Sequence, residues 1–219
     1  PSSPTAARPS PEGPFMTTDT VALSTAWIHQ PARGKRPART LLVGAAMLTC
    51  KFRFGTLGFD IAAHSTTVTD DPAETMVWLA DRLHVPPERL LMWRAEDIVL
   101  PSMISACETA RDAMAGAKLL RELELTLGGE VIDVADSYGG SRATSFDAVS
   151  HGAGLPFRRM SNDLLHRSHR TGCHGAIRTH LASRAIGTWR LWLETQEDAG
   201  SLIAATDAWV ATPDAKVRP

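Results

Sequence analysis

Hydrophobic residues along the chain fall into short apolar runs and into longer stretches with helical spacing. A short apolar run bounded by Gly, Pro or charged residues is typical of a buried strand. Such runs predict strands over 15–28, 40–49, 52–64, 90–93 and 131–135. Apolar positions three or four residues apart predict helices over 71–83, from 101 toward 115, and over 118–127, 145–153 and 175–196.

The helices over 71–83 and 175–196 have the clearest signals. Asp71 is a capping residue, and Pro72 falls in the first turn, where a backbone N–H has no partner within the helix. The second helix has an apolar stripe made up of Ile177, Leu181, Ile186, Trp189 and Leu193. Both helices therefore have one face that must pack against another layer of the protein.

The order of the elements predicts the fold class. Three strands that are close enough in sequence to pair antiparallel come first, and helices then alternate with short strands. This order favours an α/β domain in which a mixed sheet of five to six strands has helices on both faces. Ribonuclease H-like domains have this layout, but a layout alone does not fix function.

The length of the chain, 219 residues, fits one domain with short extensions. Residues 1–14 contain five prolines and few apolar side chains, so we expect a disordered leader there. The domain is expected over 15–200, followed by a C-terminal helix and tail over 201–219. No apolar run reaches about 18 residues, so no membrane span is expected. The N-terminal residues also lack the pattern of a secretory signal peptide.

Cysteine usage and charge add two expectations. The three cysteines, Cys50, Cys107 and Cys173, are a sparse and odd set, which predicts reduced thiols in a cytoplasmic protein. The net charge of −1 indicates no partner, but residues 158–190 contain seven arginines and one acid, Asp163. The seven are Arg158, Arg159, Arg167, Arg170, Arg178, Arg184 and Arg190. Contact with nucleic acid would explain this excess, as would a GC-rich coding sequence.

Three ordered segments carry a more specific pattern. The first reads WRAEDIVLPSM over 93–103; the second combines VIDV over 131–134 with SFDAVSHGAGLP over 145–156; the third reads IRTHLASRAIGTWRLWL over 177–193. In this order and at these separations they resemble the 3'–5' exonucleases related to the proofreading domain of family B DNA polymerases. These are the DEDDy type of the ribonuclease H-like superfamily, and the resemblance implies that fold.

The resemblance implies a catalytic site that this sequence does not keep. The family uses four carboxylates that hold two divalent ions, and a tyrosine one helical turn before the last aspartate. Carried over residue by residue, the Asp-x-Glu pair of the first strand falls on Asp19 and Val21. The aspartate of the family's second catalytic motif, which lies in the segment 93–103, falls on Val99. The tyrosine falls on His180, and the last aspartate on Arg184. Three of the four acids are replaced, so we expect no intact catalytic residue and no metal site.

An arginine inside an ion cavity opposes metal binding. Two unit charges about 4 Å apart interact by roughly 4 kcal/mol at an effective dielectric of 20. We therefore expect a degenerate exonuclease that binds single-stranded DNA or RNA, or a 3' end, without cleavage and without a metal cofactor. The arginines expected to contact phosphates are Arg94, Arg167, Arg170, Arg178 and Arg184.

Three other interpretations stay open. In the first, Arg184 pairs with Asp19 across the sheet instead of binding a phosphate. In the second, the domain is a residual exonuclease that depends on Mg²⁺ or Mn²⁺ and uses Asp19, Asp97 and Asp133. In the third, the domain is an interaction module, and a protein partner docks on the exonuclease groove or on a sheet edge.

The segment 166–174 corresponds to a loop in the exonuclease family, and we expect a basic loop here. His166, His169, Cys173 and His174 have the residue types of a zinc site. Their spacing matches no standard zinc motif, so contact with phosphates, or plain solvation, is favoured over metal binding.

Overall fold

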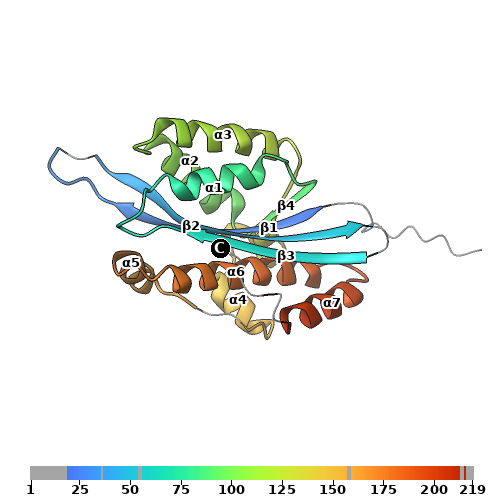
Figure 1. The fold of residues 1–219 in the computed structure, drawn as a ribbon. Helices are drawn as coiled ribbons and strands as arrows, with labels where there is room; N and C mark the ends of the chain where they lie inside the picture. Colours follow the sequence, from blue (N-terminus) through green and yellow to red (C-terminus); the bar gives the residue numbers. More distant parts are fainter. Residues whose placement is uncertain (1–18, 36, 54–55, 157–158, 213–214, 216–219) are drawn as a thin grey trace, which may run out of the picture.

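The computed structural model describes residues 19–35, 37–53, 56–156, 159–212 and 215. The leader predicted over 1–14 and Arg158 lie outside the described residues. Within them, the chain forms a central sheet with a layer of helices on each face (Figure 1).

In the described part of the chain the sheet has five strands, in the order β3-β2-β1-β4-β5. β1 pairs antiparallel with β2, and β2 with β3, whereas β4 lies parallel to β1 and β5 parallel to β4. The strands are β1 Thr20–Gln30, β2 Arg39–Arg53, β3 Thr56–Ser65, β4 Arg89–Met92 and β5 Glu130–Asp133. The predicted α/β class, a mixed ribonuclease H-like sheet with helices on both faces, is confirmed.

The helices divide between the two faces (Figure 1). One layer contains α1 Glu74–Leu83, α2 Leu100–Glu108 and α3 Ala113–Leu127, with a π-helical turn, η1 Ala95–Val99, leading into α2. The other layer contains α4 Phe146–Gly152, α5 Asn162–Arg170, α6 His174–Glu194 and α7 Gly200–Val210. Two 3₁₀ turns, η2 Val134–Tyr138 and η3 Gly140–Arg142, connect β5 to α4.

Alternation along β1 divides its side chains between two cores. Val21 and Leu23 pack with α1, α2 and α3, while Ala22 and Ala26 pack with α6. Gly44 on β2 allows α6 to lie close to the sheet, because a Cβ there would be 2.7 Å from Cδ1 of Leu181. The close approach places the polar side chains of α6 near the carboxyl half of β1.

The helix predicted from 101 toward 115 is wrong in its extent. The chain leaves α2 after Glu108 and starts α3 at Ala113. Asp112 causes the restart, because its side chain accepts hydrogen bonds from the backbone N–H of Met114 (2.9 Å) and of Ala115 (3.1 Å).

The loop expected over 166–174 is also wrong, because most of it belongs to α5. Ser161 caps this helix by accepting a hydrogen bond from the backbone N–H of Leu164 (3.2 Å). Leu165, Ser168 and His169 form its buried side. Because most residues of the segment are polar, the sequence does not show the narrow buried side by which α5 packs against the rest of the protein.

The predicted C-terminal helix is present as α7 and packs on the same core as α6. The Nε1 of Trp189 donates to Oγ1 of Thr206 (3.0 Å). The rings of Phe59 on β3 and Trp209 on α7 lie with their centroids 5.3 Å apart. These contacts join α7 to both α6 and β3.

The structure also bears on the membrane and cysteine expectations. No helix within the described ranges is long and apolar enough to cross a membrane. All three cysteines are free; Cys50 and Cys107 are buried and Cys173 is exposed. Burial raises the pKa of Cys50 to about 12 and that of Cys107 to about 11, so both thiols are protonated at neutral pH.

Gly116 lies where α3 packs so closely against α2 that there is no room for a side chain. A Cβ at this residue would lie 2.6 Å from the backbone oxygen of Cys107. We expect Gly116→Ala to lower the free energy of unfolding by about 1–3 kcal/mol, despite the higher helix propensity of alanine. Gly175→Ala in α6 is the control, because no atom lies within 4 Å of its added Cβ. Urea denaturation of both variants checks this, and equal stabilities would contradict it.

Candidate functional site

A cavity of about 530 Å³ opens beside the carboxyl end of β4 and the carboxyl half of β1. We call it the central groove. Its walls come from 23–27 on β1, the turn after β4, the start of α4, the segment leading into α5, and α6. In open α/β sheets, ligands bind outside the carboxyl ends of parallel strands, and β1 and β4 are such a pair here.

Unpaired polar atoms line the groove. Among the described residues, Oγ of Ser24, Oγ1 of Thr25 and Nε of Arg94 are buried and form no hydrogen bond within the protein. These three atoms can therefore form hydrogen bonds with a polar ligand in the groove.

Arg94 is held in place by its backbone and by its side chain. It adopts a left-handed conformation, with φ 57° and ψ 54°, at the sharp turn between β4 and the π-helical turn. Its backbone N–H donates to Oδ1 of Asp133 (2.8 Å), and its Nη2 donates to the backbone oxygen of Ser141. Arg94 therefore enters the groove from a turn whose geometry is fixed by β5.

Arg184 and His180 lie one turn apart on the groove wall formed by α6. The Arg184 guanidinium stacks over the ring of Phe146, 4.4 Å from its centroid. Its Nη1 is 3.8 Å from Oδ1 of Asp147, and Oδ2 of the same carboxylate lies 3.0 Å from Nε of Arg159. Burial lowers the pKa of Arg184 and the Asp147 carboxylate opposes this shift. One carboxylate thus serves two guanidinium groups.

The structure brings together three of the five positions derived from the exonuclease resemblance. Val99, His180 and Arg184 all line the central groove. Val21 does not, because it is buried among the side chains of α1, α2 and α3 on the other face of the sheet. Asp19 lies just before β1 and pairs with Lys51 at 3.4 Å.

The register expected on the first strand is therefore wrong. The groove is lined by β1 residues from Leu23 onward, so Asp19 lies four residues before the first of them, roughly 13 Å away along an extended chain. The alternative in which Arg184 pairs with Asp19 is wrong as well, because Arg184 pairs with Asp147.

The five arginines expected to contact phosphates occupy different places. Arg94 and Arg184 line the central groove, and Arg170 lines a second cavity described below. Arg167 is exposed on α5 and lines neither cavity. Arg178 is half-buried on α6, near His64, and lines neither cavity either.

The acids considered for a residual exonuclease do not converge. Asp19 pairs with Lys51, and Asp97 is exposed. Oδ1 of Asp133 accepts hydrogen bonds from the backbone N–H groups of Arg94 (2.8 Å) and Ala135 (3.0 Å). In the part of the chain that the structure describes, no group of three or more His, Cys, Asp or Glu side chains could hold a metal ion.

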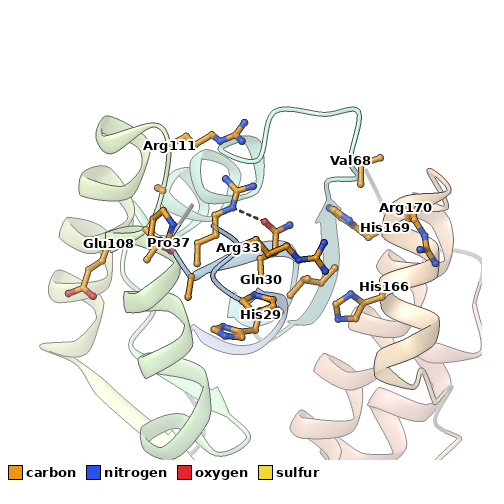
Figure 2. A pocket seen from close by; sticks show the side chains of 16 residues that line it. His29, Gln30, Arg33, Pro37, Val68, Glu108, Arg111, His166, His169 and Arg170 are labelled. Atoms are coloured by element: carbon orange, nitrogen blue, oxygen red, sulfur yellow. Dashed lines mark hydrogen bonds between the residues drawn. The ribbon is translucent and has the colours of Figure 1, made fainter. Parts of the chain in front are cut away.

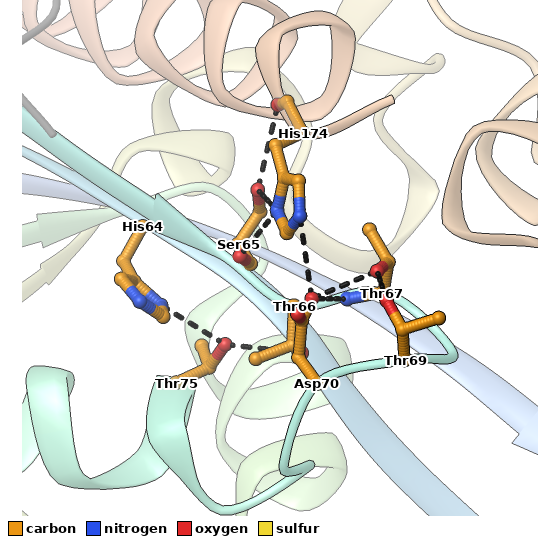
Figure 3. Close-up of polar contacts among 8 residues, drawn as sticks. All are labelled: His64, Ser65, Thr66, Thr67, Thr69, Asp70, Thr75 and His174. Atoms are coloured by element: carbon orange, nitrogen blue, oxygen red, sulfur yellow. Dashed lines mark hydrogen bonds and ion pairs between the residues drawn. The ribbon is translucent and has the colours of Figure 1, made fainter. Parts of the chain in front are cut away.

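A second polar cluster joins the end of β3 to the start of α6 (Figure 3). The Nε2 of His174 lies 3.3 Å from Oδ2 of Asp70, and its Nδ1 lies 2.9 Å from the backbone oxygen of Ser65. Because a carbonyl oxygen only accepts, Nδ1 carries a proton directed at Ser65. The Ser65 hydroxyl, 3.4 Å from the same Nδ1, therefore has no base to activate it. Although a Ser, a His and an Asp meet here, the cluster is a structural clamp rather than a nucleophilic site.

Asp70 makes the clamp sensitive to acid. Hydrogen bonds from the hydroxyl (2.8 Å) and the backbone N–H (2.6 Å) of Thr67 lower the pKa of its carboxyl group. The carboxylate therefore stabilises the fold above the ordinary aspartate pKa of about 3.9, and this contribution disappears as pH falls through the lowered value.

Asp70→Asn removes this contribution. We expect the variant to be less stable than the unmodified chain at pH 6, and the difference in unfolding free energy to shrink steadily below about pH 4. Urea denaturation at several pH values measures the difference. A gap that stays constant down to pH 2 would contradict this assignment.

Sequence reasoning missed several groove residues. Ser24, Thr25 and Trp27 are ordinary strand residues in sequence. Their place in the lining of the groove follows from the three-dimensional structure, in which β1 has a bulge near Ala26 and α6 lies beside it. Asp147 lies inside the second motif segment, but nothing in the sequence indicates that two arginines share it.

Comparison with protein-family models finds no match for this chain, and a search of curated proteins also finds none.

Proposed function

We propose that this chain binds single-stranded nucleic acid in the central groove and does not cleave it. The observation that carries the proposal is the meeting of Arg94, Arg184 and His180, from two different segments, at the carboxyl end of β4 and beside residues 23–27 of β1. Guanidinium groups suit phosphate recognition because they offer several fixed donors. A 3' terminal stretch of the strand is the segment that the exonuclease resemblance favours.

The floor of the groove supports binding without catalysis. Two-metal phosphodiester cleavage needs carboxylates that neutralise both ions. Here the β1 side of the groove has the hydroxyl groups of Ser24 and Thr25, and the two other acid positions are Val99 and Arg184. The nearby Asp147 is already shared by two arginines. Trp27, half-buried on the groove wall, offers an aromatic surface on which a base can stack.

Two further parts of the proposal concern setting and partners. The free thiols of Cys50, Cys107 and Cys173 support a cytoplasmic location, where cysteines stay reduced. Neither a metal cofactor nor a protein partner is required. A metal-dependent exonuclease and a protein-interaction module are the alternatives that the experiment below separates.

The test combines binding and turnover on one substrate. A fluorescent single-stranded oligonucleotide is titrated with the protein at low salt, and its length is then analysed after incubation with Mg²⁺ or Mn²⁺. The proposal predicts saturable binding and an intact oligonucleotide. Shortening from the 3' end would support the exonuclease instead, and absence of binding at low salt would overturn the proposal.

A further inference from the structure

A second cavity, about 990 Å³ in volume, lies where β1 and β2 extend past the rest of the sheet (Figure 2). We call it the hairpin pocket. Residues 27–30 of β1 pair with β2, whereas the pairing of β1 with β4 is confined to Thr20, Val21 and Ala22. The pocket lies between the turn that joins α2 to α3 and the last turn of α5.

The hairpin pocket is strongly cationic. Four arginines from three segments line it: Arg33 and Arg39 of the β1–β2 hairpin, Arg111 after α2, and Arg170 at the end of α5. Glu108 is the one carboxylate among its lining residues, and Figure 2 shows its side chain turned away from the middle of the pocket. Clustered positive charges raise the local concentration of anions and so favour the binding of an anionic ligand.

Most of these charges are available to a ligand. Arg33, Arg111 and Arg170 are exposed and form no ion pair among the described residues. The Nε of Arg39 donates to Oε1 of Gln30 (2.7 Å), which fixes the orientation of that guanidinium. In Figure 2, Arg33, Arg111 and Arg170 lie apart from one another around the pocket rather than converging on one point. This arrangement suits a chain of phosphates better than a single phosphate ion.

The hairpin pocket continues the central groove. On β1, residues 23–27 line the groove and residues 28–30 line the pocket. On the α5 side, Leu165 lines the groove, and His166, His169 and Arg170 line the pocket. A single strand lying along β1 and α5 would therefore pass from one cavity into the other.

We propose that the hairpin pocket binds backbone phosphates of the same single strand whose end occupies the central groove. This inference rests on the proposed function and extends it. It gives the nucleic acid a second contact, and it implies that the strand runs from the central groove along β1 and α5 to the hairpin pocket. The contacts are made to phosphates, so they are independent of base sequence. The pocket contributes affinity only when the strand is long enough to reach it.

The experiment compares two oligonucleotide lengths, about 4 and about 16 nucleotides. The double variant Arg33→Glu/Arg170→Glu is expected to bind the long oligonucleotide about tenfold more weakly than the unmodified chain and to bind the short one equally well. Two lost phosphate contacts should also make the slope of log K against log salt shallower by about 1.4 for the long oligonucleotide.

A matched control changes the same charge elsewhere. Arg82→Glu/Arg121→Glu alters two exposed arginines on α1 and α3, and it should leave both affinities unchanged. Equal loss in both double variants, or equal loss for both lengths, would overturn the role of the hairpin pocket while leaving the central groove intact. If the unmodified chain binds neither length, the proposed function fails and this inference fails with it. Arg33→Gln/Arg170→Gln replaces the glutamate variant if circular dichroism shows that the latter is unfolded.

Discussion

Replacing Arg184 with glutamate is expected to weaken binding of a single-stranded oligonucleotide by at least about tenfold. The change removes a charged hydrogen-bond donor and places a second carboxylate beside Asp147. Hydrogen bonds to charged groups contribute about 1.5–3 kcal/mol, and 1.4 kcal/mol corresponds to a factor of ten in affinity. Fluorescence anisotropy titration at fixed low salt measures the effect.

Two further variants make the result interpretable. Arg121→Glu makes the same charge change on the opposite face of the sheet and should leave the affinity unchanged. Arg184→Lys keeps the charge and should retain more affinity than the glutamate variant, although it loses the stacking on Phe146. Equal affinities for Arg184→Glu and Arg121→Glu would show that the central groove does not hold the strand.

Trp189→Ala is expected to produce the largest loss of stability, about 3–5 kcal/mol in the free energy of unfolding. The indole is 2% exposed, its Nε1 donates to Thr206 (3.0 Å), and its ring meets Trp192 at a centroid distance of 5.2 Å. Its removal leaves a cavity between α6 and α7 and unpairs the Thr206 hydroxyl as an acceptor. Such a loss is a large part of the stability of an ordinary domain.

Trp209→Ala is the comparison for this variant. Trp209 belongs to the same aromatic cluster but is only half-buried, on α7. We expect its replacement to lower the unfolding free energy by less than half as much as Trp189→Ala. Similar losses in both variants, measured by urea denaturation, would contradict this prediction and show that Trp209 on α7 contributes as much to stability as Trp189 on α6.

Strands and the strongest helices could be predicted because their patterns are local. The apolar runs of β1, β2 and β3 and the stripe along α6 each lie within a short stretch of sequence. The break between α2 and α3 could not be predicted from periodicity, since a single capping side chain, Asp112, determines it. α5 could not be predicted from an apolar stripe, because only three of its residues are buried and two of these, Ser168 and His169, are polar.

The candidate site was predictable in part for a related reason. The motifs place Val99, His180 and Arg184 on elements whose order fixes where they meet, and the structure brings all three to the central groove. The position on β1 was misassigned because the groove stretch, residues 23–27, contains no acidic residue, so the motif was assigned to the nearest aspartate, Asp19. Arg33 and Arg39 of the hairpin pocket are close in sequence, but Arg111 and Arg170 are distant from them, and only folding brings these arginines together.

The most direct test of the central claim is the salt dependence of single-strand binding. If the central groove binds backbone phosphates through Arg94 and Arg184, log K should fall linearly with log salt, with a slope of about −1.4 or steeper. The oligonucleotide should remain intact throughout when Mg²⁺ is present. A slope near zero, or rapid loss of 3' nucleotides in Mg²⁺, would contradict the account.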